Sequence, residues 1–102
     1  MTIEQNNENG KITLTPQGWL DTAASPDLNA ALEAITEATE LVFDFDQVEY
    51  MASAGLRVVV AADRKARSMD IPFSVINVCP GVMSIFRMTG IDKKLTLIGK
   101  QA

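Results

Sequence analysis

Ser53 is the residue whose type and surroundings most directly suggest a chemical role. It precedes a segment rich in alanine and apolar residues that ends with cationic residues, which is the pattern of a helix beginning at a hydroxyl residue. A serine at a helix N-cap normally accepts a hydrogen bond from a free backbone amide, which is a purely structural role. The same amides and the positive end of the helix dipole also favour an added phosphate. Spacing alone therefore leaves two interpretations of Ser53 open, a structural cap and a site of phosphorylation.

A second group that could do chemistry consists of three aspartates, Asp21, Asp44 and Asp46. In α/β folds the ends of strands meet the starts of helices, so these carboxylates are expected at the same end of the sheet as Ser53. Paired carboxylates bind Mg²⁺ or act as acid and base, and one of them could accept a phosphoryl group. Asp21 has an equally simple structural interpretation, as a turn residue whose carboxylate binds local backbone amides.

The composition lacks the usual parts of an enzyme. The chain has no histidine and one cysteine, Cys79, so it lacks the commonest general base and cannot form an internal disulfide. Cys79 lies where a strand gives way to a helix, where a thiol could be activated, but a small buried residue is the simpler interpretation. We therefore expect no enzymatic activity, no catalytic residues, no metal and no cofactor.

Length and charge limit the kinds of partner. The 102 residues suffice for one domain with a single core, and 47% hydrophobic with 22% charged residues is typical of a globular chain. The formal net charge of -4 gives no field that would attract nucleic acid or an anionic membrane. The N-terminus does not resemble a signal peptide, and no apolar run is long enough to span a membrane. We expect a cytoplasmic domain over residues 1–102 that binds a protein partner.

The elements around Ser53 can be placed from the same patterns. Leu41–Phe45 is an almost uninterrupted apolar run whose length and β-propensity suit a buried strand. Val58–Val60 taken alone could be a strand, but the neighbouring alanines and the cationic last turn favour a helix that begins at Ser53. On that helix Ser53, Arg57 and Arg64 share an exposed strip if the sheet covers the apolar side. The strip is either an ordinary solvated helix face or a surface for a partner.

The N-terminal part predicts a hairpin followed by a helix. Asn9-Gly10 suits a tight turn, and alternation in the flanking segments indicates two strands, of which the first is short and the second is interrupted at Pro16–Gly18. Ser25 as N-cap with Pro26 in the first turn predicts a helix from about Pro26 to residues 36–38. The apolar stripe of this helix is expected to face the core.

The C-terminal part predicts a strand, a helix and a last strand. Phe73–Val78 has strand character, and the helix that follows ends at Thr89-Gly90, where glycine supplies the C-terminal cap. Met83 and Met88 of this helix could form an adaptable contact patch, but filling the core is the simpler interpretation of both. Residues 93–98 give the last short strand.

Three blocks of the sequence resemble the STAS domain family, which includes the anti-sigma factor antagonists. Met51–Leu56 is similar to the family's Met-Asp-Ser-Ser/Thr-Gly-Leu block, with the phosphorylated serine at Ser53 and the glycine at Gly55. The aspartate and the second hydroxyl residue of that block are replaced by Ala52 and Ala54. The lost aspartate is a group that could orient the serine or a kinase-bound metal.

The other two blocks occur in the family's order. Gly18–Asp21 resembles a Gly-x-Leu-Asp segment that lies near the phosphosite, and Ile85–Lys93 resembles the block before the last strand. The resemblance implies a single α/β domain with a mixed sheet of about five strands and three helices. Members usually continue into a C-terminal helix, which we expect to be absent because this chain stops at Ala102.

The resemblance implies an anti-sigma factor antagonist that acts by partner switching. Unphosphorylated, such a protein binds an anti-sigma factor with serine kinase activity and so frees a sigma factor, and phosphorylation of Ser53 would end that binding. The implied partner-binding residues are Asp21, Ser53, Gly55, Arg57 and Arg64. Two alternatives stay open, an accessory subunit of a membrane transport complex and a small phosphoryl-acceptor protein. The sequence leaves the oligomeric state and the identity of the partner undetermined.

Overall fold

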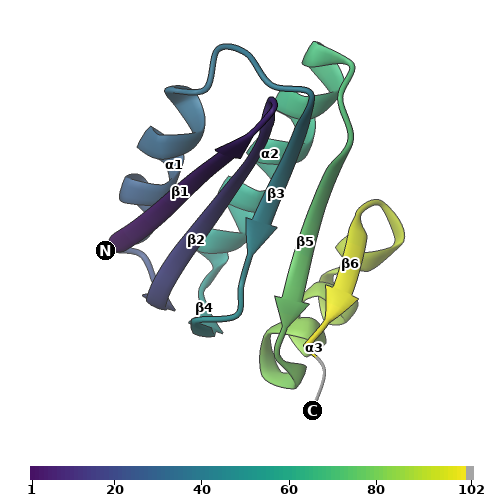
Figure 1. Ribbon diagram of the computed structural model, residues 1–102. Helices are drawn as coiled ribbons and strands as arrows, with labels where there is room; N and C mark the ends of the chain where they lie inside the picture. The colour runs from purple at the N-terminus through teal and green to yellow at the C-terminus, as the bar shows by residue number, and fades with distance from the viewer. Residues whose placement is uncertain (101–102) are drawn as a thin grey trace.

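The computed structural model describes residues 1–100 and combines one sheet with three α-helices (Figure 1). In chain order the elements are β1 (Thr2–Glu8), β2 (Lys11–Leu20), α1 (Ser25–Glu33), β3 (Glu40–Asp44), β4 (Val48–Met51), α2 (Ser53–Met69), β5 (Phe73–Val78), α3 (Pro80–Thr89), the short 3₁₀ helix η1 (Ile91–Lys93) and β6 (Thr96–Gly99). The predicted α/β class, mixed sheet and three α-helices are confirmed.

The sheet has the strand order β1-β2-β3-β5-β6, and β4 pairs with β2 beyond the end of β3. β1 is antiparallel to β2, whereas every other pairing is parallel. The parallel strands are joined by crossover helices, which lie together on one face of the sheet (Figure 1). The carboxyl end of β2 leads into the loop before α1, and the carboxyl end of β4 leads into the start of α2.

The N-terminal hairpin is present but is longer than the sequence indicated. Asn9 and Gly10 adopt φ angles of 53° and 94° in the turn, as their residue types predict. β1 has seven residues, so its prediction as a short strand was wrong. β2 continues through Pro16, because β3 pairs with β2 only as far as Leu14 and a proline is tolerated where a strand has a partner on one side.

α1 begins and ends earlier than predicted. Its N-cap is Ala24, so the prediction of Ser25 as N-cap was wrong, and the Ser25 hydroxyl instead donates to the backbone oxygen of Asp21 over 2.5 Å. The helix ends at Glu33, several residues before the predicted end. There the Lys65 ammonium of α2 donates to two of the last carbonyl oxygens of α1, at 2.8 and 3.3 Å. The Leu32 oxygen also accepts from the Ile35 N–H at 3.1 Å, so Lys65 adds a charged donor to the last carbonyl oxygens of α1.

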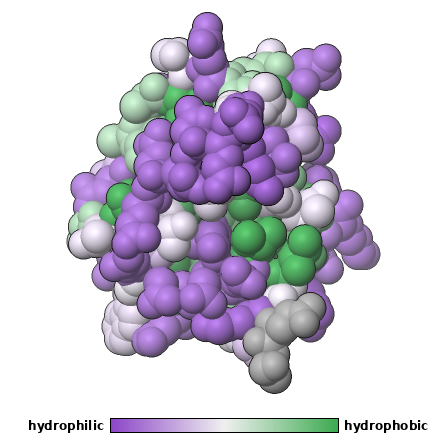
Figure 2. Space-filling model, viewed as in Figure 1, coloured by the Kyte–Doolittle hydropathy of each residue, from purple (hydrophilic) through white to green (hydrophobic). Residues whose placement is uncertain are grey.

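One hydrophobic core lies between the sheet and the three helices. It includes the large, fully buried side chains of Leu14, Leu20, Leu28, Phe43, Phe45, Val59, Val75 and Phe86. Burial of each such side chain contributes roughly 1.5–3 kcal/mol, so this face of the sheet supplies most of the stability. The opposite face of the sheet is largely hydrophilic (Figure 2). Crossing a membrane would need a longer and more apolar helix than any that residues 1–100 form.

The C-terminal part follows its prediction closely. β5 has the predicted bounds, and α3 ends at Gly90, whose φ of 75° is the left-handed cap that glycine provides. Met83 packs against the core, but Met88 is 85% exposed, so the expectation that both methionines fill the core was wrong for Met88. β6 starts later than predicted because η1 precedes it. Within residues 1–100, no helix follows β6.

Candidate functional site

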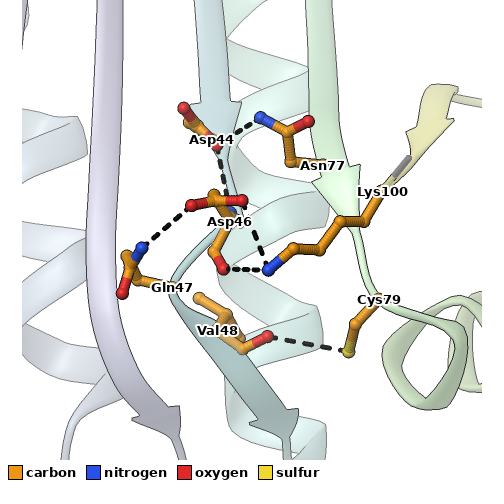
Figure 3. A network of polar contacts seen from close by, with 7 residues as sticks. All are labelled: Asp44, Asp46, Gln47, Val48, Asn77, Cys79 and Lys100. Carbon is orange, nitrogen blue, oxygen red and sulfur yellow. Dashed lines mark hydrogen bonds and ion pairs between the residues drawn. The ribbon is translucent and has the colours of Figure 1, made fainter. Parts of the chain in front are cut away.

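A network of polar contacts holds the loop between β3 and β4 (Figure 3). The Asp44 carboxylate accepts hydrogen bonds from the Asn77 side-chain amide and from the backbone N–H of Asp46, both at 3.0 Å. The Lys100 ammonium donates to the backbone oxygen of Asp46 at 2.9 Å and lies 3.3 Å from its carboxylate. These contacts join the loop to β5 and to the end of β6, so they fix the position at which β4 begins.

β4 brings the start of α2 against the end of β2. The mixed pattern of residues 46–51 did not predict this strand, which accounts for a sheet of six strands rather than about five. β4 runs parallel to the end of β2, and Leu20 lies opposite Met51. The backbone N–H of Ala52 then donates to the oxygen of Leu20 at 3.0 Å. α2 therefore starts directly beside the residue where β2 ends.

Gly55 makes this close approach sterically feasible. The residue is buried, and a Cβ added to it would lie 2.7 Å from Cγ of Leu20 and 2.8 Å from the Leu20 backbone oxygen. Protein interiors are packed too densely to absorb contacts of that length without a shift of backbone. Because Gly55 is buried, it can serve a binding surface by placing α2 against β2, and not through direct contact with a partner.

Ser53 is the first residue of α2 and is exposed. The prediction that this helix begins at Ser53 is confirmed, but the N-cap is Ala52, which has no hydrogen-bonding side chain, so the interpretation of Ser53 as a structural cap is wrong. No hydrogen bond within residues 1–100 uses the Ser53 hydroxyl, which is therefore accessible to a modifying enzyme. It also lies at the positive end of a 17-residue helix, where free backbone N–H groups favour negative charge.

Arg57 and Arg64 lie on the exposed side of α2, as predicted. Neither makes an ion pair within residues 1–100, whereas Arg67 pairs with Asp63 at 2.9 Å. On the buried side of α2, Leu56 and Val60 are half-buried, and Leu56 packs against the core. The fully buried residues of the helix are Gly55, Val58, Val59, Ala62 and Ala66.

Two grooves flank this side of α2. One, of about 330 Å³, lies between α1 and α2, and it places the loop after Asp21 beside the helix that begins with Ser53. The other, of about 610 Å³, lies between α2 and η1 and is lined by Leu56 and Ile91, among other residues. Arg57 lines both grooves. Asp21, Ser53 and Arg57 therefore belong to one end of the molecule.

The three aspartates do not form a magnesium site. Asp44 and Asp46 are engaged in the network of Figure 3, and the Asp21 carboxylate accepts a hydrogen bond from the backbone N–H of Ala24 at 2.8 Å. Within residues 1–100, no group of three or more acidic, histidine or cysteine residues is placed to hold a metal ion. The geometry gives the phosphoryl-acceptor alternative no support. Cys79 is half-buried, with its thiol 3.7 Å from a backbone oxygen of β4.

An exposed aromatic pair near this end of the molecule was missed at the level of sequence. Trp19 on β2 and Tyr50 on β4 are opposite each other in the sheet, with ring centroids 5.7 Å apart. They are 62% and 46% exposed, and each immediately precedes a fully buried residue, Leu20 or Met51. Successive side chains of a strand point to opposite faces of the sheet. The alternation of an exposed aromatic residue with a buried residue is therefore the sequence signal for placing both rings on the face that the helices leave open.

The chain belongs to the STAS domain family. The family model described as "Mlab, STAS domain" matches residues 1–99, nearly the whole chain. The fold described above and the block that surrounds Ser53 agree with that membership, which the three short blocks of sequence had indicated.

Several known proteins resemble the chain over most of their length. It is 27% identical over 92 residues to the Bordetella bronchiseptica protein named "Putative anti-sigma factor antagonist BtrV", covering 88% of this chain and 79% of that protein. The crystal structure of an anti-sigma factor antagonist from Mycobacterium paratuberculosis is 25% identical, with a TM-score of 0.83 and coverage of 95% and 84%. The phosphorylated form of the Bacillus cell fate determinant SpoIIAA shares the fold at 16% identity, with a TM-score of 0.75 and coverage of 94% and 90%.

Proposed function

We propose that this protein is an anti-sigma factor antagonist that acts by partner switching in the cytoplasm. The observation that carries the proposal is the exposed Ser53 as the first residue of α2, within a block that resembles the serine motif of the STAS family apart from Ala52 and Ala54. The relative named "Putative anti-sigma factor antagonist BtrV" supports the same class of function. The protein acts by binding, without enzymatic activity of its own, and its partner is an anti-sigma factor with serine kinase activity.

The binding surface is the end of the molecule that carries Ser53. Arg57 and Arg64 lie on the exposed side of α2 and make no ion pair within residues 1–100, and Asp21 flanks them from the loop before α1. Gly55 contributes by holding the start of α2 against Leu20. Unphosphorylated, this surface binds the anti-sigma factor, and the sigma factor is released for transcription.

Phosphorylation of Ser53 ends binding of the anti-sigma factor through an electrostatic effect. A phosphate adds about -1.5 to -2 charges at neutral pH and three strong hydrogen-bond acceptors. The helix start tolerates that charge, because its backbone N–H groups and dipole favour an anion, so the fold is retained. Arg57 lies one helical turn away and pairs with the phosphate, which withdraws a cation from the partner and places an anion on the surface.

Phosphorylation in an extract tests the proposal. The wild type and Ser53→Ala are incubated with ATP and an extract of the native cells, and mass spectrometry locates added phosphate. We expect modification at Ser53 in the wild type, and no phosphate in Ser53→Ala. Phosphate at another residue, or an unmodified Ser53 in an extract whose kinase binds the protein, would contradict the switch.

A second candidate is an accessory subunit of a membrane transport complex. The observation that favours it is Ala52, which stands where the family's phosphorylated members carry an aspartate and leaves the helix start without a side-chain cap. In such a subunit Ser53 belongs to a constitutive interface and need not be phosphorylated. A neighbouring gene for a transporter would favour this candidate, and a neighbouring gene for a kinase would favour the switch.

A further inference from the structure

Positive charge in this acidic protein is concentrated on α2 and around η1. The chain has nine Lys and Arg residues and a formal net charge of -4. Most of the cations lie on α2 or in and after η1, namely Arg57, Arg64, Lys65, Arg67, Lys93 and Lys94. Lys65 and Arg67 are occupied, because Lys65 donates to the end of α1 and Arg67 pairs with Asp63. Arg57 and Arg64 have no acidic partner within residues 1–100.

These two arginines line a groove whose other lining residues are apolar. The groove lies between α2 and η1, has a volume of about 610 Å³, and is completed by Leu56, Val60, Ala61 and Ile91. Leu56, Ala61 and Ile91 are half-buried and pack against the core, so they form a fixed apolar floor. Arginine binds carboxylates through two parallel N–H groups, and it is the cation best suited to a partly desolvated ion pair.

We infer that this groove binds an acidic amphipathic helix of the protein partner, an inference that rests on the function proposed above. The groove runs along α2 from Leu56 to Arg64, a distance of roughly 12 Å at 1.5 Å per residue, which two turns of a partner helix would match. Apolar side chains at i, i+3 or i+4 and i+7 fill the floor, and Asp or Glu beside them pair with Arg57 and Arg64. The concave shape of the groove favours such a helix over an extended lipid surface.

The groove also explains how a phosphate on Ser53 would act on binding. Arg57 lines the groove and lies one turn from Ser53, so it can pair with a carboxylate of the partner or with the phosphate, but not fully with both. The added negative charge would also repel the acidic helix. Modification of Ser53, one helical turn before Arg57, therefore weakens binding at the groove without any change of fold.

A peptide experiment tests the inference directly. The probe is a labelled 14-residue helical peptide with leucines on one stripe and glutamates beside it. One matched peptide has glutamine in place of each glutamate, and another has the same composition with the stripe scrambled. Fluorescence anisotropy measures affinity, and NMR chemical shifts locate the site. Of the three peptides, we expect only the acidic amphipathic one to bind, and we expect its affinity to fall at higher salt. Its binding should shift the NMR signals of Leu56, Val60 and Ile91.

Charge-matched variants separate the groove from general electrostatics. Arg57→Gln combined with Arg64→Gln should lower the affinity for the acidic amphipathic peptide about fivefold, because each exposed ion pair contributes modestly to binding. Lys11→Gln combined with Arg87→Gln removes the same charge outside the groove and should change affinity less than twofold. The inference would be overturned if both double variants lost the same affinity for the peptide, or if all three peptides bound equally well. It would also be overturned if the protein bound phosphatidylglycerol vesicles but none of the peptides.

The native partner distinguishes failure of this inference from failure of the proposed function. If the Arg57/Arg64 double variant still retains an anti-sigma factor that Ser53→Asp loses, the groove is wrong and the switch stands. If Ser53→Asp retains that factor and the double variant loses it, the switch is wrong and the groove stands.

Discussion

Replacement of Gly55 by alanine is the perturbation whose cost the structure defines best. The new Cβ would meet Leu20 at 2.7 Å from Cγ and at 2.8 Å from the backbone oxygen. That oxygen also accepts the hydrogen bond from Ala52 that joins β2 to the start of α2, at 3.0 Å. The clash therefore cannot be relieved by a side-chain rotation alone. It moves either the end of β2 or the first turn of α2.

The expected loss of stability follows from two opposing effects. Overpacking of a dense interior costs about 1–3 kcal/mol. Alanine favours the helix over glycine by at most about 1 kcal/mol. The net effect of Gly55→Ala is a loss of about 1–2 kcal/mol in the free energy of unfolding. For a domain of this size that loss lowers Tm by about 5–15 °C.

Thermal unfolding followed by circular dichroism measures this effect. Gly81→Ala is the matched control, because Gly81 also lies in the first turn of a helix, α3, and a Cβ there would meet nothing within 4 Å. The control should keep the wild-type Tm or exceed it slightly. If Gly55→Ala melts at or above the wild type, the close approach to Leu20 is not what positions α2, and the reasoning fails.

Three further predictions concern the same end of the molecule. Ser53→Asp should unfold at the wild-type Tm or slightly above, since a carboxylate in the first turn of a helix contributes about 0.5 kcal/mol; a lower Tm would mean that lost binding reports misfolding. Lys65→Met should lose about 1 kcal/mol in chemical denaturation, because the Glu33 carbonyl oxygen loses the Lys65 donor and that of Leu32 keeps only the Ile35 N–H, whereas Lys93→Met should lose less than half as much. Asp21→Asn should keep the hydrogen bond from the Ala24 N–H, and with it the wild-type stability. Weaker partner binding of this variant in calorimetry would therefore assign the Asp21 charge to the interface. Unchanged binding would show that Asp21 has only a structural role.

Local patterns predicted most of the elements because each one rests on neighbours in the sequence. The turn at Asn9-Gly10, the bounds of β5 and the glycine cap of α3 all follow from residue types a few positions apart. The exposure of Ser53, Arg57 and Arg64 follows from helical periodicity in the same way.

The features that the sequence did not predict depend on residues far apart in the chain. β4 is a strand because β2 extends beyond β3 and offers it a free edge, which no pattern within residues 48–51 indicates. Gly55 is required because Leu20 lies so close to it, and a carbonyl oxygen at the early end of α1 accepts a hydrogen bond from Lys65. The groove beside Arg64 needs η1 from the other end of the chain.

The most direct test of the central claim is a pull-down from the native cell extract with the wild type, Ser53→Ala and Ser53→Asp as bait. Mass spectrometry identifies the retained proteins, and Tm values confirm that all three baits are folded. We predict that wild type and Ser53→Ala retain an anti-sigma factor with a kinase domain and that Ser53→Asp loses it. Retention of transporter subunits by all three baits would contradict partner switching and would assign the protein to a transport complex.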